Sequence, residues 1–331
     1  MSADRSVRAG LEGLVQDARW RRWLFRPEWV TLLLLIVAIW MGSALSPYFA
    51  DLRFVLESAS PYIEFGLIAL VLTLIIITGE IDLSVASTMA LCSVVFAKFY
   101  HAGVPVGFAI ALALLLGTAA GYLNGILVTR LGIPSIILTI GTLTLYRGIA
   151  QILLGDRSLG RFPSWFVGID WITVGIVPVP VIIFLVAAAA LGFVLHKTVL
   201  GRQIYQIGVN PRTARFSGIP VEQIKLGLFC LSGFVAAIAG LMTVSRLGVA
   251  RFDIARGGEL EIVLTVMLGG TYIFGGRGNM LGTVMALWLL VVMRAGMNVA
   301  NIKIESQLTV LGLLLIFAII VSDFIYRKSQ R

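Results

Sequence analysis

Apolar residues are grouped into long runs that are separated by short breaks rich in glycine, proline or charge. The runs cover residues 29–46, 62–79, 83–100, 104–129, 134–154, 176–196, 224–245, 259–275, 280–298 and 305–325. An α-helix needs about 20 predominantly apolar residues to cross a hydrocarbon core of about 30 Å, and most runs approach that length. The pattern therefore predicts an all-α, polytopic membrane protein with about ten transmembrane helices.

The composition excludes most soluble classes of protein. Of the 331 residues, 59% are hydrophobic and only 13% are charged. Soluble domains are usually about 45–50% apolar and about 25% charged, so a soluble enzyme, a nucleic-acid-binding protein and a disordered regulator are all disfavoured. Cys92 and Cys230 both lie in apolar runs, and there are two histidines, so neither a disulfide framework nor a metal site is predicted.

The distribution of basic residues predicts the orientation. Lysine and arginine favour the cytoplasmic side, and their densest clusters precede the first run, lie in loop 197–223 and follow the last run. This predicts a cytoplasmic N-terminal segment 1–28, a transmembrane domain 29–326 with the cytoplasmic loop 197–223, and a cytoplasmic tail 327–331. Both termini are then cytoplasmic. The polar, arginine-bearing start does not resemble a cleavable signal peptide.

The loop 197–223 contains a short predicted helix over residues 211–217. Asn210 is a good N-cap, Pro211 suits the first helical position, and Gly218 can end the helix in a left-handed conformation. A helix of about two turns is unstable alone in water. Either it packs under the transmembrane bundle, or it presents Arg212, Arg215 and Phe216 to a cytoplasmic partner. The residues alone leave both alternatives open.

Glycines with helical spacing predict close helix packing in run 104–129. Gly117, Gly121 and Gly125 recur every four residues and share one helix face. Small residues let helix backbones approach closely in a membrane. Asn124 lies on the same helix and is expected to face the bundle interior.

Two predicted outer segments carry arginines that depart from the basic-residue bias. Arg157 and Arg161 lie in segment 155–175, and Arg251 and Arg256 lie in segment 246–258. Local pairing or contact with lipid headgroups explains them simply. The alternative is a basic docking surface for an acidic extracytoplasmic partner.

Several blocks of sequence, in order, resemble the permeases of bacterial ABC importers of the ribose type, which include the ribose, rhamnose and autoinducer-2 systems. The resemblance spans about residues 29–325 and rests on blocks 79–85, 123–130, 133–143, 201–219 and 268–278. Glu80 and Ala86 depart from the pattern, since relatives more often have glycine there. Both departures fall in or beside the break between the second and third runs.

The resemblance implies a permease subunit of the bacterial inner membrane that imports a monosaccharide or a sugar-like signal. It implies three partners besides the lipid bilayer: a second permease copy or paralogue, two cytoplasmic ATPase subunits that bind ATP-Mg, and a periplasmic sugar-binding protein. It also makes the helix 211–217 a coupling helix that inserts into the ATPase. The coupling residues are then Gly208, Asn210, Pro211, Arg212, Ala214, Arg215, Phe216 and Gly218.

The chain itself is not predicted to hydrolyse ATP or to hold a cofactor or a metal. A P-loop requires a glycine followed by lysine and then serine or threonine. None of the five lysines follows a glycine. The glycine-rich stretch 275–278 lacks a lysine and is predicted to be a tight turn.

Polar residues inside the apolar runs are candidates for the translocation pathway. They are Asn124, Thr139, Thr142 and Thr144, although hydrogen bonding between helices is the simpler explanation for each of them taken singly. Glu80 and Asp82 are expected to form a structural turn or cap, but they also raise the alternative of an ion-coupled secondary transporter. A membrane scaffold or receptor without transport is a third possibility. Arg147 and Arg294 lie in apolar runs, and the sequence does not decide their roles.

Overall fold

The structure is a computed structural model that describes residues 27–45, 49 and 51–329. The predicted cytoplasmic segment 1–28 lies almost entirely outside the described residues, as do the last two residues of the predicted tail 327–331. The helices are α2 (Pro27–Leu45), α3 (Leu52–Ile77), α4 (Val85–His101), α5 (Val106–Thr129), α6 (Ser135–Leu154), η2 (Ile169–Trp171), α7 (Val179–Lys197), α8 (Val199–Val209), α9 (Pro211–Phe216), α10 (Val221–Leu247), α11 (Gly258–Leu268), α12 (Met280–Val299) and α13 (Ile304–Ser329).

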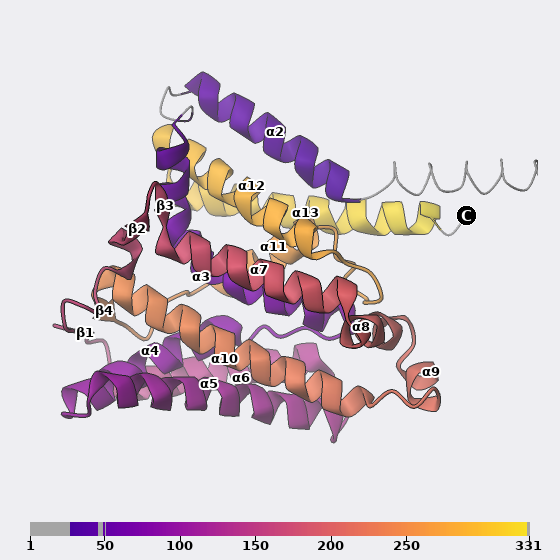
Figure 1. Cartoon of the computed structure of the whole chain (residues 1–331), viewed down its shortest axis with the longest axis horizontal. Coiled ribbons are helices and arrows are strands. Elements are labelled where there is room, and N and C mark those ends of the chain that lie inside the picture. The colour runs from indigo at the N-terminus through magenta and orange to yellow at the C-terminus, as the bar shows by residue number, and fades with distance from the viewer. Residues whose placement is uncertain (1–26, 46–48, 50, 330–331) are drawn as a thin grey trace, which may run out of the picture.

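The long helices lie side by side in a bundle, with small strands at one end and α8 and α9 at the other (Figure 1). The strands form two antiparallel pairs, β1 (Leu159–Gly160) with β4 (Val249–Ala250) and β2 (Thr173–Val174) with β3 (Val177–Pro178). The start of α2 and the end of α13 lie toward the same end of the bundle as α9 (Figure 1).

The all-α membrane architecture predicted from the apolar runs is confirmed. Within the described residues, six helices have the length and composition to cross a membrane, namely α3, α5, α6, α7, α10 and α12. Shorter apolar stretches occur in α2, α4 and α13. Most of α3, α10 and α12 is buried, whereas only a minority of the residues of α5, α6 and α7 are buried. Helices α3, α10 and α12 therefore form the centre of the bundle.

The run 259–275 is not the single helix that its apolar sequence predicted. Helix α11 contains 11 residues and ends at Leu268, and the chain continues without helix to Asn279. At 1.5 Å per residue, such a helix is about 16 Å long, roughly half of a hydrocarbon core. Gly270 follows with a left-handed φ of 83°, which ends the helix where hydropathy alone gave no stop signal.

Helix boundaries follow local capping residues. The Asp51 side chain accepts from the Arg53 amide at the start of α3, and Asn279 accepts from the Leu281 amide at the start of α12. Gly248, in a left-handed conformation, ends α10. These short-range hydrogen bonds satisfy backbone groups that a helix end leaves without a partner.

Helices α5 and α10 approach closely through the glycines singled out in the sequence. A Cβ on Gly121 would lie 2.1 Å from the carbonyl oxygen of Phe229, and one on Gly117 would lie 2.4 Å from that of Gly233. Both contacts are with backbone, which cannot rotate away. The predicted packing role of these glycines is confirmed, and it joins α5 to α10 as a pair.

Replacing Gly121 by valine is expected to destabilise the bundle, because the added carbons would force α5 and α10 apart. Overpacking usually costs about 1–3 kcal/mol, and the backbone contact favours the upper end of that range. The measurement is the apparent melting temperature of the detergent-solubilised protein. Gly107→Val on the same helix is the matched control, since a Cβ there meets nothing within 4 Å among the described residues. Equal melting temperatures for the two variants would contradict the packing argument.

Candidate functional site

The chain between α3 and α4 is a non-helical segment, residues 78–84, that lies within the bundle. The Ile81 amide donates to the Ser135 hydroxyl at 3.0 Å, and the Thr139 hydroxyl donates to the Ile81 carbonyl at 3.3 Å. Asp82 accepts from the Ser84 amide at 3.0 Å and from the Ser84 hydroxyl at 2.7 Å. Non-helical backbone is tolerated at membrane depth where the protein supplies such partners. We call residues 78–84 the break segment.

Side chains from α5, α6 and α10 extend this hydrogen-bond network. The Asn124 amide group donates to the Ser84 hydroxyl at 2.8 Å, and the Tyr146 hydroxyl donates to the Asn124 side-chain oxygen at 3.3 Å. The Ser232 hydroxyl donates to the second Asp82 oxygen at 3.0 Å. The break segment is therefore attached to three neighbouring helices.

A second non-helical segment, residues 269–279, packs on the first. The Gly276 amide donates to the Ile77 carbonyl at 2.8 Å. A Cβ on Gly275, whose φ is 87°, would lie 2.8 Å from the Gly79 nitrogen. Only glycine suits both the left-handed conformation and this close approach. The glycine-rich stretch 275–278 is thus a tight turn, as its sequence predicted, that contacts the end of α3.

Helix α8 rests directly on these two segments. A Cβ on Gly208 would lie 1.8 Å from the Ile77 carbonyl oxygen and 2.3 Å from the Gly276 nitrogen. The Tyr205 hydroxyl donates to the Gly278 carbonyl at 2.7 Å. The cytoplasmic loop predicted from the sequence is therefore in van der Waals contact with both interruptions of the bundle.

The short helix predicted over residues 211–217 is present as α9. The Asn210 side chain accepts from the amides of Arg212 and Thr213 at 3.0 and 3.1 Å, Pro211 opens the helix, and Gly218 follows it with a φ of 80°. The predicted caps are confirmed. The coupling role of α9 stays a prediction.

One side of α9 is anchored and the other faces outward. Ala214 is buried, whereas Phe216 is 93% exposed and Arg212 is also exposed. The Arg215 guanidinium forms an ion pair with Glu222, on the first turn of α10, at 2.6 Å. Helix α9 therefore presents Phe216 and Arg212 on its exposed side while Ala214 and Arg215 attach it to the rest of the chain.

The pathway candidates fall into two groups. Asn124, Thr139 and Thr142 are buried, and the first two hold the break segment as described above. Thr144 is exposed on the outward face of α6 and donates to the Ile140 carbonyl at 3.2 Å. The structure therefore does not bring the four residues together on one surface, and their role in translocation stays a prediction.

The outer arginines are gathered by the pairing of β1 with β4. Leu159 lies opposite Ala250, which brings Arg157 and Arg161 near Arg251, and all three arginines are exposed, as is Arg256. Arg251 donates to Asp253 at 2.7 and 2.8 Å, and this hydrogen bonding lowers the pKa of the Asp253 carboxyl. Local pairing thus accounts for Arg251, and docking by this surface stays a prediction.

Arg147 and Arg294, whose roles the sequence did not decide, have defined partners in the structure. Arg147, on α6, donates to the carbonyls of Phe252 and Ile254 at 2.9 and 2.6 Å. Arg294 forms an ion pair with Glu261 at 3.0 Å and so attaches α12 to α11. Both act within the protein, since the first fixes an outer loop and the second fixes the short helix.

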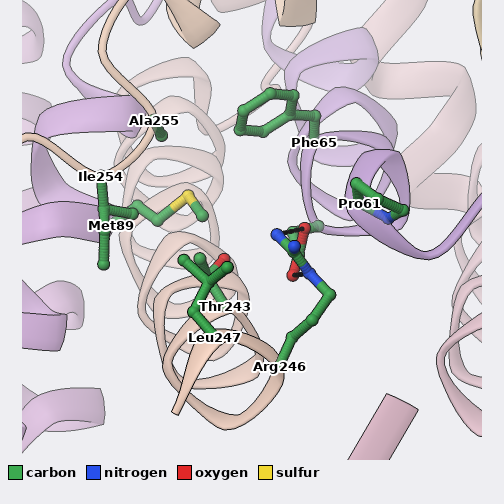
Figure 2. Close-up of a pocket in the computed structure, with 9 residues that line it drawn as sticks. Pro61, Phe65, Met89, Thr243, Arg246, Leu247, Ile254 and Ala255 are labelled. Carbon is green, nitrogen blue, oxygen red and sulfur yellow. Dashed lines mark hydrogen bonds and ion pairs between the residues drawn. The ribbon is translucent and has the colours of Figure 1, made fainter. Parts of the chain in front are cut away.

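A cavity of about 130 Å³ lies beside the end of α10 and the loop that follows β4 (Figure 2). Its wall comprises Pro61, Glu64, Phe65, Met89, Thr243, Arg246, Leu247, Ile254 and Ala255. Glu64 accepts from Arg246 at 2.9 and 3.3 Å, and the Thr243 hydroxyl donates to the Ala239 carbonyl at 2.9 Å. The polar side chains of the wall are therefore already engaged within the bundle.

Comparison with known proteins gives the family. The family described as "branched-chain amino acid transport system / permease component" matches residues 54–319. The chain belongs to this family of permeases. Among its relatives are the autoinducer 2 import system permease proteins LsrD of Escherichia coli strain K12, Shigella flexneri and Escherichia coli O157:H7. Each is 35% identical over 303 residues, or 90% of this chain and 92% of the relative.

No solved structure matches the permease significantly. The relatives confirm the resemblance to ribose-type ABC permeases that the sequence blocks indicated. They also show that the resemblance extends over nearly the whole chain, as predicted.

Sequence reasoning missed part of the network around the break segment. The Lys225 ammonium pairs with Glu80 at 2.5 Å, but none of Lys225, Ser232 and Tyr146 was singled out from the sequence. A signal was present, since Lys225 and Ser232 are seven residues apart and share one face of α10. What the sequence could not reveal was that this face meets the break segment.

Replacing Gly208 by alanine is expected to displace α8 from the two interruptions, since its Cβ would overlap the Ile77 carbonyl. The apparent melting temperature should fall by at least about 3 °C. Differential scanning fluorimetry of the purified permease measures this shift. Gly227→Ala is the control, because a Cβ there meets nothing within 4 Å among the described residues. A wild-type melting temperature for Gly208→Ala would refute the contact.

Replacing Arg147 by methionine is expected to release the outer loop that contains Arg251 and Arg256. The two lost hydrogen bonds come from a charged group, which is worth about 1.5–3 kcal/mol per bond, so the loop should open more often. Trypsin cleavage after Arg251 and Arg256 should then accelerate about tenfold or more. Arg157→Met, at an exposed position in the same outer layer, serves as the control. Equal cleavage rates in the two variants would show that Arg147 does not hold the loop.

Proposed function

We propose that this permease is the membrane subunit of an ATP-driven importer for a sugar-like signal of the autoinducer-2 class, or for a related monosaccharide. The proposal is supported by the match over residues 54–319 and by 35% identity to permeases named for autoinducer 2 import. The family description names branched-chain amino acids instead. We favour the sugar-like class because the individual relatives are similar over nearly their entire length.

We infer that α9 lies in the cytoplasm, together with both termini, in a bacterial inner membrane. The basic residues of loop 197–223 support this orientation. With α4 and α11 counted together with their adjoining extended segments, the chain makes about ten crossings. An even number agrees with the position of α2 and α13 at the α9 end (Figure 1).

We further propose that α9 docks into a cytoplasmic ATPase subunit, which binds ATP-Mg and hydrolyses it. The observation that carries this proposal is the exposed Phe216 on a helix that is capped at Asn210 and attached to α10 through Glu222. A helix that is attached to the bundle and exposes an aromatic side chain can bind a partner and transmit the movement of that partner as a rigid body. Neither hydrolysis nor nucleotide binding is assigned to this chain.

The translocation pathway is proposed to run between two permease copies, along the outward face of α6. Thr144 is exposed there, and a Cβ on Gly141 or Gly148 would meet nothing within 4 Å among the described residues. Small residues beside an exposed threonine let a second subunit approach closely and suit a face that meets a hydrated solute. Asn124, Thr139 and Thr142, which are buried, would then hold α6 in position within the bundle and would not contact the solute.

On the outer side, we propose that Arg157, Arg161 and Arg256 meet acidic residues of a periplasmic sugar-binding protein. Their exposure, together with the pairing of β1 and β4 that brings segments 155–175 and 246–258 together, supports a docking surface. Such charged contacts mainly govern the rate and the specificity of association.

An ion-coupled secondary transporter has less support. Glu80 is paired with Lys225, and Asp82 already accepts hydrogen bonds from Ser84 and Ser232. Carboxylates engaged in this way are poorly prepared to bind a coupling ion. A scaffold or receptor without transport has no specific observation in its favour.

The experiment is photo-crosslinking from position 216 in cells that contain the ATPase subunits, followed by uptake measurements. We expect a crosslink to the ATPase, and at least about tenfold weaker ATPase binding for Phe216→Ala, as for a buried aromatic anchor. Val209→Ala, at an exposed position beside α9, is the control for non-specific surface effects. Uptake should cease when ATP is depleted at clamped ion gradients. Ion-driven uptake without ATPase subunits, or crosslinks to this chain alone, would contradict the proposal.

A further inference from the structure

The break segment and α10 are joined at two points. The Lys225 ammonium lies 2.5 Å from a Glu80 carboxylate oxygen, and the Ser232 hydroxyl donates to Asp82 at 3.0 Å. Lys225 and Ser232 are seven residues apart and share one face of α10. Glu80 and Asp82 of the break segment therefore both contact this face of α10.

The Lys225–Glu80 ion pair is shielded from solvent. Its side chains are 11% and 16% exposed, whereas those of the Arg215–Glu222 pair are 50% and 46% exposed. Exposed ion pairs contribute little, but separating a buried pair leaves a poorly solvated charge. The contact between α10 and the break segment therefore resists separation far more than a surface pair does.

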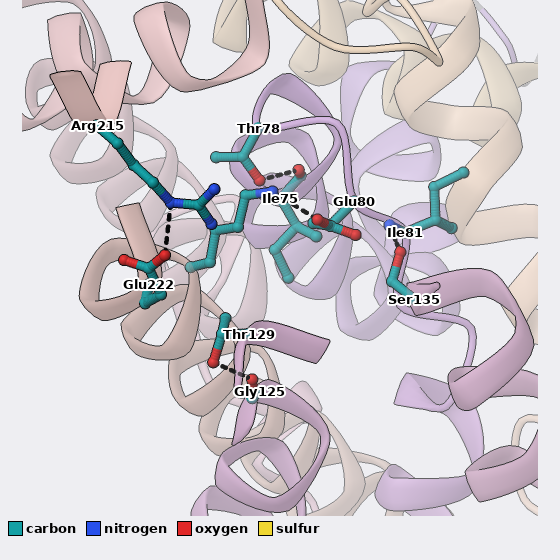
Figure 3. Close-up of polar contacts among 10 residues, drawn as sticks. Ile75, Thr78, Glu80, Ile81, Gly125, Thr129, Ser135, Arg215 and Glu222 are labelled. Atoms are coloured by element: carbon teal, nitrogen blue, oxygen red, sulfur yellow. Dashed lines mark hydrogen bonds and ion pairs between the residues drawn. The ribbon is translucent and has the colours of Figure 1, made fainter. Parts of the chain in front are cut away.

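The same turn of α10 also holds α9. Glu222, which pairs with Arg215, precedes Lys225 by three residues, and the Ile219 amide donates to the Ala214 carbonyl at 3.1 Å. Figure 3 shows the Arg215–Glu222 pair, Glu80 and the hydrogen bond from Ile81 to Ser135 in one view. A continuous series of contacts thus leads from α9 through the start of α10 to the break segment.

Beyond the break segment, the contacts reach α5 and α6. Ser84 is hydrogen-bonded to Asn124, and Ile81 is hydrogen-bonded to Ser135 and Thr139. A displacement of α10 that moves Glu80 would therefore move the helices that carry the proposed pathway face.

We propose that Glu80 and Lys225 are positioning residues whose ion pair transmits the movement of α9, through α10, into the break segment and on to α6. This inference rests on the proposed function, in which α9 receives the movement of an ATPase. It assigns to the pair a role in coupling transport to hydrolysis rather than in binding either the ATPase or the solute.

The test uses the complete importer, reconstituted in vesicles with its ATPase subunits and its soluble receptor. The quantity measured is the amount of solute transported per ATP hydrolysed. Lys225→Met and Glu80→Gln should each lower this ratio by about fivefold or more, within the range of typical coupling free energies. Lys225→Arg keeps the charge and should retain most of the ratio.

The double variant Glu80→Gln with Lys225→Met should have a transport ratio no lower than that of the more severe single variant. Either single substitution already removes the ion pair, so the second adds no further loss. Arg246→Met is the matched control. Its ion pair with Glu64 is also on α10 and also shielded, with side chains that are 22% and 2% exposed. It should lower the melting temperature but leave the transport ratio at the wild-type value.

Three results would overturn the inference: a wild-type ratio for Lys225→Met, an equal loss of ratio for Arg246→Met, or fully additive effects in the double variant. Its failure is distinguishable from failure of the proposed function. If position 216 crosslinks to the ATPase and wild-type uptake needs ATP, but Lys225→Met remains fully coupled, the ion pair has no transmitting role and the function stands. If the wild-type importer shows no ATP-dependent uptake, both are wrong.

Discussion

Backbone groups inside a membrane-embedded bundle must find hydrogen-bond partners within the protein, and this constraint governs the region between α3 and α4. In the non-helical residues 78–84, backbone groups are hydrogen-bonded to side chains from α6 and to the Asp82 side chain. These hydrogen bonds persist only while each partner residue keeps its position. The break segment is therefore the place where the positions of α5, α6 and α10 are set relative to one another.

Close packing links the loop 197–223, which is predicted to be cytoplasmic, to the bundle interior. Helix α8 contacts Ile77, which precedes the break segment, and Gly276 of the second non-helical segment. This close contact is possible because Gly208 has no Cβ. Helix α10 begins immediately after α9 and is packed on α5 through backbone contacts at Gly121. An interior this close-packed transmits displacement rather than absorbing it. A movement of α9 would therefore be transmitted through closely packed helices to the helices proposed to flank the solute.

Features with a local cause could be predicted from the sequence. The apolar runs predicted the membrane helices, Asn210 and Gly218 predicted the ends of α9, and the glycine spacing predicted the α5 packing face. Features that depend on distant residues could not. Lys225 and Glu80 are separated by 145 positions, and Arg147 binds carbonyls 105 and 107 positions away. Hydropathy also missed the end of α11, because the residues after Leu268 remain apolar while their backbone conformation changes.

The break segment is a buried element whose polar groups have hydrogen-bond partners, and not a flexible linker. Hydrogen–deuterium exchange of the intact permease in lipid nanodiscs can distinguish these two states. We expect the amides of Ile81 and Ser84, which donate to Ser135 and Asp82, to exchange as slowly as those of the flanking helices α3 and α4. Exchange at these two amides as fast as in the exposed turn at residues 217–218 would contradict it.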